Sequence, residues 1–237
     1  MGAVVGVVGA RGGAGASVVA AALARGAARR RVRTCLVDLA LVGGGLDVLL
    51  GVEAQPGVRW PDLSDARGRL DGDELLARLP RWSGVPVVST ERGSGPDPAA
   101  LVDVVAALAE VTAAHAGVLV LDVDRAALAS GAGVPGLLEA CDEVLVVAPL
   151  DVLAVAGAAA VRDRLDGPAA LVVRRPAPGR LSGAEVADAV GLDVAATVRW
   201  DRGLAGAIER GAGPCAARGP VERAGRELAA RYVRGEQ

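Results

Sequence analysis

The chain has 237 residues and a formal net charge of −2. The length suits one large α/β domain, and the charge gives no reason to expect a nucleic-acid partner. All 26 basic residues are arginine, because the sequence contains no lysine, and phenylalanine is also absent. The core is therefore expected to be aliphatic, and no lysine of this chain can take part in its chemistry.

Short aliphatic runs alternate with longer helical patterns along the chain. The predicted strands are residues 3–9, 34–39, 85–89, 117–123, 143–149, 170–174 and 194–198. The predicted helices are residues 17–30, 97–115, 151–165, 182–190 and 204–211. The strands are built on continuous aliphatic runs instead of alternating ones, as expected where helices cover both faces of a parallel sheet. The sequence thus predicts a doubly wound, mostly parallel α/β sheet with helices on both faces.

Three stretches depart from this alternation. Residues 40–72 are rich in Gly, Pro, Asp and Trp, and we expect an irregular excursion there. Residues 174–183 are expected to form a loop. Residues 220–237 mix acids with arginines and are only weakly amphipathic, so a helix packed on its own domain is favoured over membrane contact. Because no linker marks a boundary, we expect a single domain over residues 1–237.

The remaining polar residues give little sign of a site. Cys35, Cys141 and Cys215 are far apart and are expected to be reduced thiols in the core. The lone His115 is expected to end a helix. No apolar run approaches the ~20 residues that span a bilayer, and the first residues lack the basic region of a signal peptide. We therefore expect a soluble, cytoplasmic protein.

Residues 9–17, GARGGAGAS, join the first predicted strand to the first predicted helix. Glycines let the backbone turn tightly and direct N–H groups at an anion, and the helix N-terminus adds its dipole. In a Rossmann protein, Asp38 at the end of the second strand would bind a ribose. In a P-loop protein, Ser17 would reach Mg²⁺ and Asp122 would end the strand beside it. Ser17, Asp122 and the segment 141–158 favour the P-loop.

Longer pieces of the chain resemble the MinD/ParA group of deviant Walker-A ATPases. Within that group they are most similar to the CpaE/TadZ-like proteins, including actinobacterial septum-site-determining proteins. The resemblance rests on RGGAGAS (11–17), LVDLALVGGGLDVLLG (36–51), GVRWPDL (57–63), CDEVLVVAPLDVLAVAGA (141–158) and residues 171–211. It implies a P-loop NTPase-like fold. Relatives often carry an N-terminal receiver-like domain, which we expect to be absent here.

The resemblance assigns roles to individual residues. It implies that ATP or ADP is held by the backbone of Gly12, Gly13, Ala14, Gly15, Ala16 and Ser17. It implies that Ser17 and Asp122 hold Mg²⁺, Asp122 through water, and that Asp38 orients the attacking water. From the residues alone, Asp38 is equally an acid that caps the loop after its strand, and Asp122 has a similar structural alternative.

The loop departs from the pattern of active relatives, KGGxGKS/T, at both lysines. Arg11 stands at the first lysine and Ala16 at the second. Losing the second lysine would weaken phosphate binding by roughly 10–100-fold. Three roles are open for Arg11: charge stabilisation across a dimer, nucleotide contact without turnover, or a solvated loop residue. The asparagine that recognises adenine in relatives is also not apparent in residues 174–176.

These departures predict a degenerate localisation or regulatory factor with weak or no ATP hydrolysis, acting in septum placement or in pilus or secretion machinery. The alternatives are a slow dimeric ATPase that uses Arg11, and a Rossmann dinucleotide-binding protein. The resemblance implies protein partners from those machineries, allows a homodimer, and allows recruitment to a pole or septum. No specific nucleic-acid partner is expected.

One group of charges is not used by this interpretation. Arg29, Arg30, Arg31 and Arg33 lie at the end of the first predicted helix and directly after it. They are expected to complement the negative end of the helix dipole. Contact with DNA or anionic lipid is the alternative, which the net charge of the chain disfavours.

Overall fold

The computed structural model describes residues 2–40, 44–90, 97–130, 133–176, 179–215 and 218–233. Its strands are β1 (Ala3–Gly9), β2 (Thr34–Asp38), β3 (Arg81–Trp82), β4 (Val85–Val88), β5 (Val118–Val123), β6 (Glu143–Pro149), β7 (Ala169–Arg174) and β8 (Val194–Val198). Its helices are α1 (Ala16–Ala28), α2 (Gly45–Leu50), α3 (Gly72–Arg78), α4 (Pro98–Ala114), α5 (Ala127–Ser130), α6 (Val134–Glu139), α7 (Val152–Arg162), α8 (Gly183–Val190), α9 (Leu204–Glu209) and α10 (Pro220–Tyr232), with a 3₁₀ turn η1 (Trp60–Leu63).

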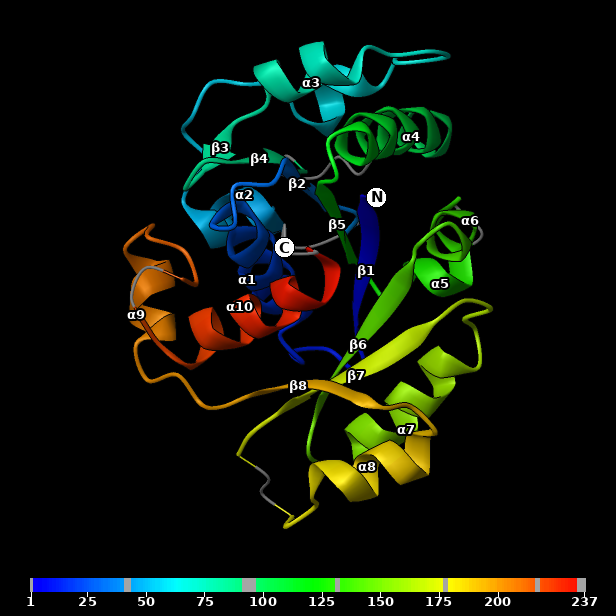
Figure 1. The fold of residues 1–237 in the computed structure, drawn as a ribbon, viewed down its shortest axis with the longest axis vertical. Helices are drawn as coiled ribbons and strands as arrows, with labels where there is room; N and C mark the ends of the chain where they lie inside the picture. The colour runs from blue at the N-terminus through cyan, green and yellow to red at the C-terminus, as the bar shows by residue number, and fades with distance from the viewer. Residues whose placement is uncertain are drawn as a thin grey trace.

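Within these ranges the strands form one sheet in the order β3-β4-β2-β5-β1-β6-β7-β8 (Figure 1). Neighbouring strands run parallel, except that β3 is antiparallel to β4. The predicted doubly wound, mostly parallel sheet is therefore confirmed, and each predicted strand and helix lies close to its predicted bounds.

Helices cover both faces because the central strands of the sheet bury side chains on both sides. In β1, Val5 and Val7 pack in the cluster built with α1, α2 and α10. Val8 packs in the opposite cluster, with residues of α4, α6, α7 and α8. Figure 1 shows α1 and α10 on one side of the sheet and α4 and α7 on the other. Continuous apolar strands of this kind are what two covered faces require.

The strand order excludes the Rossmann alternative. β1 lies between β5 and β6, and β2 pairs with β5 rather than with β1. In the Rossmann order the first two strands are neighbours. The inserted β5 places Asp122 directly across from Asp38 in the register of β2 and β5. Both carboxyl groups consequently lie at the carboxyl edge of the sheet, where β1 ends at Gly9.

The expectation of an irregular excursion over residues 40–72 is wrong in part. The segment contains α2 and the turn η1 among its described residues. The sequence also gave no signal for α3, β3, α5 or α6. These elements span seven residues or fewer, so they are too short to show a hydrophobic period.

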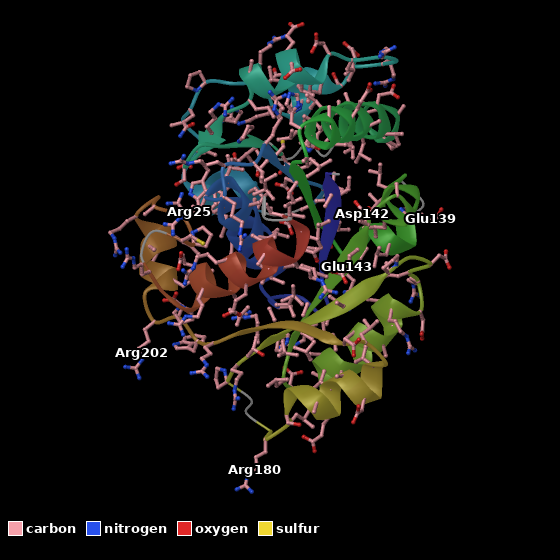
Figure 2. The ribbon with its side chains drawn as sticks, viewed as in Figure 1. Arg25, Glu139, Asp142, Glu143, Arg180 and Arg202 are labelled. Carbon is pink, nitrogen blue, oxygen red and sulfur yellow. The ribbon has the colours of Figure 1, made fainter. Side chains whose placement is uncertain are left out.

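The C-terminal helix α10 packs on its own domain, as predicted, and its partner in the structure is α1. The helices meet through glycines, because a Cβ at Gly26 would lie 2.3 Å from the carbonyl oxygen of Gly225. At the far end of α10, Arg231 donates to Glu143 with its Nε at 2.7 Å and its Nη2 at 2.5 Å. Glu143 begins β6 (Figure 2). No helix in the described ranges is long and apolar enough to cross a bilayer.

Candidate functional site

The loop between β1 and α1 has the backbone shape of an anion cradle. Gly13 and Gly15 lie in the left-handed region, with φ of 69° and 87°, a conformation that other residues adopt at a cost. Gly15 is the N-cap of α1, with no side chain to cap the helix. A Cβ at Gly12 or Gly13 would meet no atom within 4 Å, so this side of the loop is open to a ligand.

A cleft of about 770 Å³ lies over the loop. All six predicted loop residues line it, together with Arg11 and the predicted metal-site residue Asp122. The far side is formed by the segment after β5, including Asp124 and Arg125, by α7, and by Arg164 just beyond the end of α7. Its volume lies within the range of small-molecule sites, about 300–1,000 Å³. The structure therefore brings together most of the residues that the sequence assigns to one site.

Ser17 and Asp122 form the candidate metal site. The Ser17 hydroxyl lies close enough to the Asp122 carboxyl group to lower its pKa, and Asp122 is 4% exposed. Burial, and then the neighbouring Asp38 charge, raise the pKa of Asp122 from 3.8 to about 7. A hydroxyl and a carboxylate suit Mg²⁺, which commonly keeps several waters and binds one or two carboxylates plus phosphate. No larger group of metal-binding side chains occurs in the described ranges, so waters and phosphate would complete the shell.

Asp38 is held inside the protein instead of lining the cleft. Its oxygens accept hydrogen bonds from the backbone N–H groups of Ala40 at 2.9 Å and Leu46 at 2.8 Å, and from the Thr90 hydroxyl at 3.2 Å. Burial raises the pKa of the Asp38 carboxyl group. These hydrogen bonds fit the alternative in which Asp38 caps the loop after its strand. That Asp38 orients the attacking water stays a prediction.

Arg11 is paired within its own chain. Its Nη2 lies 2.8 Å from Oδ2 of Asp151, the residue that caps α7. Arg11 Nη1 also donates to the carbonyl oxygen of Gly12 at 3.1 Å. The Arg11 hydrogen bond holds the pKa of Asp151 below its usual range. In this conformation the guanidinium is directed to Asp151, so a role across a dimer would require this ion pair to open.

Three arginines at the site were not predicted from the sequence. Arg125 donates to the carbonyl oxygen of Ala10 at 3.4 Å, and Arg164 lines the cleft from the end of α7. Arg174 donates to the carbonyl oxygen of Ala14 at 2.5 Å. Arg125 and Arg174 lie at or just beyond the carboxyl ends of strands. Parallel sheets bind ligands at this position. Closeness to the end of a predicted strand is therefore the sequence signal that could have indicated Arg125 and Arg174.

A second cavity of about 260 Å³ adjoins the first and shares Gly15 and Val18 with it. It is lined by Arg174 and by residues after β8, including Trp200, whose side chain is prominently exposed. Indole faces stack on planar rings, so this cavity has room and chemistry for a heterocycle beside the phosphate cradle.

The residues expected to be structural behave as predicted. Cys35, Cys141 and Cys215 are free and buried, and burial raises the pKa of each thiol to about 12. His115 caps the end of α4, with its Nδ1 3.0 Å from the carbonyl oxygen of Val111. These groups lie outside the cleft and take no part in its chemistry.

Comparison with known proteins gives a fold and a bacterial relative. No protein-family model matches the chain. An uncharacterised protein found in two strains of Mycobacterium tuberculosis is 42% identical over 214 residues, or 89% of this chain. The chain spans only 58% of the length of that relative.

The solved structures are more distant in sequence and similar in shape. A ParA family ATPase from Chlorobium tepidum superposes with a TM-score of 0.79 at 20% identity, covering 96% of this chain and 97% of its own. The chain has the ParA/MinD fold. MinD from Pyrococcus horikoshii with Mg-ADP gives 0.73 at 16% identity, over 97% and 95% of the two chains. MinD in the MinC:MinD complex of Aquifex aeolicus gives 0.73 at 17%, over 97% and 94%. The loop 9–17 thus joins the first strand to the first helix of a ParA/MinD fold.

The Asp122→Asn variant is expected to be more stable than the wild type without metal, by roughly 2–4 kcal/mol at pH 8. Asp122 has a higher pKa folded than unfolded, so its ionisation destabilises the fold as the pH rises from about 4 to 7. Urea unfolding in EDTA at several pH values checks this. The difference between the variants should shrink toward pH 4, and a difference that does not change with pH would contradict the assignment.

Proposed function

We propose that the chain is a degenerate member of the MinD/ParA group that retains a nucleotide and turns it over slowly or not at all. The observation that carries the proposal is the combination of an intact cradle with a missing charge. Gly13 and Gly15 keep the loop's shape and the Ser17 hydroxyl lies beside the Asp122 carboxyl group, while Ala16 stands where active relatives have lysine.

The nucleotide we propose is ATP or ADP with Mg²⁺. Its phosphates would lie on the N–H groups of the loop, with Mg²⁺ held by Ser17 and, through water, by Asp122. Its base would occupy the smaller cavity beside Trp200. Arg125 and Arg164 supply positive charge on the far side of the cleft, which partly offsets the absent lysines. The metal supplies charge neutralisation when bound, and this chain's residues orient the phosphates.

Slow turnover follows from where the remaining charges lie. Phosphoryl transfer depends mainly on positioning and on charge stabilisation, to which a single arginine can contribute roughly 10³–10⁵-fold. Arg11 is engaged by Asp151 at 2.8 Å, and Asp38 is engaged by two backbone N–H groups. In the described conformation neither side chain is free for the role that the resemblance implies.

The cellular role we propose is a localisation or regulatory factor for septum placement or for pilus or secretion machinery. The partners would be proteins of those machineries, and a second copy of this chain is an allowed partner. The proposal rests on the resemblance of the chain to the CpaE/TadZ-like group and on its ParA/MinD fold. Identification of proteins cross-linked to the chain in its own cells would separate the septum role from the pilus or secretion role.

Replacing Gly12 with Glu is expected to weaken Mg-ATP binding by at least ~10-fold, because a carboxylate would stand in the anion cradle. A side chain fits there, since a Cβ at Gly12 meets nothing within 4 Å. Gly167→Glu is the matched control, because Gly167 is equally uncrowded and lies before β7 at the opposite edge of the sheet. Titration calorimetry measures both.

Phosphate release from the same wild-type preparation distinguishes the proposed nucleotide-retaining protein from the slow dimeric ATPase. Phosphate release by the wild type and by Arg11→Ala should be equally slow. Turnover that Arg11→Ala abolishes would instead support the slow dimeric ATPase.

A further inference from the structure

A separate polar cleft lies at the amino edge of the sheet, far from the loop and its two cavities at the carboxyl edge. It has a volume of about 650 Å³ and lies between the end of α1 and the segment from α3 to β4. Arginines from the end of α1, from the turn after it and from β3 line it: Arg25, Arg29, Arg31, Arg33 and Arg81. Asp73 is the carboxylate among its lining residues.

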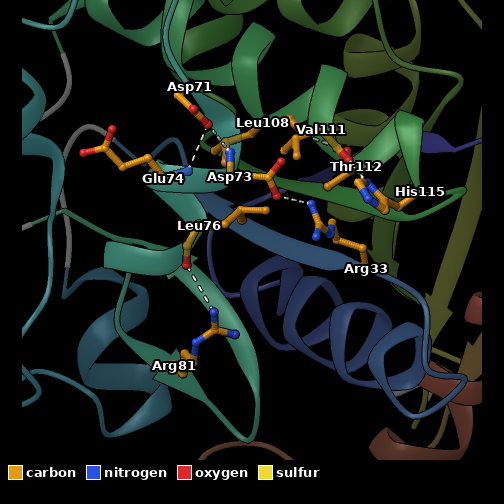
Figure 3. A network of polar contacts seen from close by, with 10 residues as sticks. All are labelled: Arg33, Asp71, Asp73, Glu74, Leu76, Arg81, Leu108, Val111, Thr112 and His115. Atoms are coloured by element: carbon orange, nitrogen blue, oxygen red, sulfur yellow. Dashed lines mark hydrogen bonds and ion pairs between the residues drawn. The ribbon is translucent and has the colours of Figure 1, made fainter.

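Two of these guanidinium groups are held in place by neutral partners. Arg25 stacks on the Trp82 ring at 5.5 Å, and its Nε is buried without a hydrogen-bond partner among the described residues. Arg81 donates to the carbonyl oxygens of Leu76 at 3.2 Å and Gly84 at 3.3 Å. Figure 3 shows the bond from Arg81 to Leu76. An aromatic ring and two carbonyls orient these cations without neutralising them.

The charges around the cleft do not balance. Arg33 is paired with Asp73 (Figure 3), and Arg29 is paired with Glu222 at 2.6 Å. The C-terminus of α1 contributes only about half a negative charge. Arg31 is exposed and makes no ion pair within the described ranges. Roughly two and a half positive charges are therefore left in one hollow of a chain whose net charge is −2.

We propose that this cleft binds a small oligophosphate, either free or as the phosphate chain of a nucleotide. Its volume matches small-molecule sites, about 300–1,000 Å³. Guanidinium groups bind phosphate oxygens in pairs of parallel hydrogen bonds, and here they converge on one hollow from separate segments. The excess charge matches a compact anion with two or more negative charges. The site is independent of the loop at residues 9–17 and adds a ligand to the proposed function.

The arrangement favours a compact anion over a polymer. A nucleic-acid backbone needs positive charges spaced along a path, whereas Arg25, Arg33 and Arg81 face a common hollow. Arg29 also borders a neighbouring cleft lined by Arg218 and Arg223, and the two clefts together would give a polymer a path. Duplex DNA is for this reason included as a competing probe.

The test uses inorganic tripolyphosphate and the Gly12→Glu variant, in which binding at the loop is weakened so that the cleft is the stronger site. Calorimetry at fixed ionic strength should show one equivalent bound. Adding Arg31→Gln and Arg81→Gln should weaken that binding by ~100-fold, since each removes a charged hydrogen bond. Adding Arg180→Gln instead should leave it unchanged. Arg180 lies in the loop before α8 and points away from the body of the protein (Figure 2).

Other outcomes would overturn the proposal. Loss of all tripolyphosphate binding in Gly12→Glu would place every phosphate at the loop. Equal tripolyphosphate binding with and without the Arg31→Gln and Arg81→Gln changes would show that the ligand does not bind in this cleft. Tight binding of duplex DNA or of phosphatidylglycerol vesicles, without competition by tripolyphosphate, would identify a polymer or a membrane. If the double change does not fold, Ser83→Asp places a negative charge at the cleft wall and should weaken binding alone.

Discussion

Replacing Ala16 with lysine is expected to strengthen Mg-ATP binding by roughly 10–100-fold, because it restores a charged hydrogen bond to the phosphates. Ala16 begins α1 and lines the cleft over the loop. A lysine there would extend into a space that already holds Ser17 and Asp122. Titration calorimetry of the wild type and of Ala16→Lys with Mg-ATP measures the change.

Ala16→Gln is the matched control for this prediction. Glutamine has a similar reach and no charge, so its affinity should stay near that of the wild type. If Ala16→Lys binds Mg-ATP no better than Ala16→Gln, the loop does not present its ligand as a P-loop does, and the proposed site would have to be abandoned.

Replacing Gly225 with valine is expected to destabilise the protein by about 3 kcal/mol or more, the upper range for overpacking a core. A Cβ at Gly225 would lie 2.2 Å from the carbonyl oxygen of Ala22. Neither backbone can yield without separating α10 from α1. Chemical unfolding monitored by circular dichroism measures the free energy of unfolding.

Gly136→Val is the control for this change, because Gly136 also lies in a helix and a Cβ there meets nothing within 4 Å. It should cost little by comparison. Equal stability of Gly225→Val and the wild type would mean that α10 is not docked on α1 in solution. Membrane contact by the C-terminal helix, disfavoured above, would then become the better interpretation.

The fold was predictable because its long elements carry a strong local signal. β1 and β5 are continuous aliphatic runs, and α4 and α7 have helical spacing over 17 and 11 residues. Ser17 and Asp122 could be placed together because parallel strands end at one edge. The order of the strands, which separates this sheet from a Rossmann sheet, is specified by no local pattern and is seen only in the structure.

The contacts that decide the chemistry could not be predicted, because they join residues far apart in sequence. Arg11 and Asp151 are 140 residues apart, and Arg174 and Ala14 are 160 apart. No local pattern specifies that Arg11 pairs within its own chain. Nor does one show that the Asp38 oxygens are already taken by Ala40 and Leu46. The local pattern likewise relates the arginines after α1 only to the helix dipole, and only the structure places Arg81 beside them.

The most direct test of the central claim is to measure Mg-ATP binding and phosphate release on one sample of the wild type. We expect about one nucleotide bound per chain, with binding weakened by Gly12→Glu, and less than one phosphate released per chain over an hour. Release of many phosphates per chain in that time, or no binding at all, would contradict it.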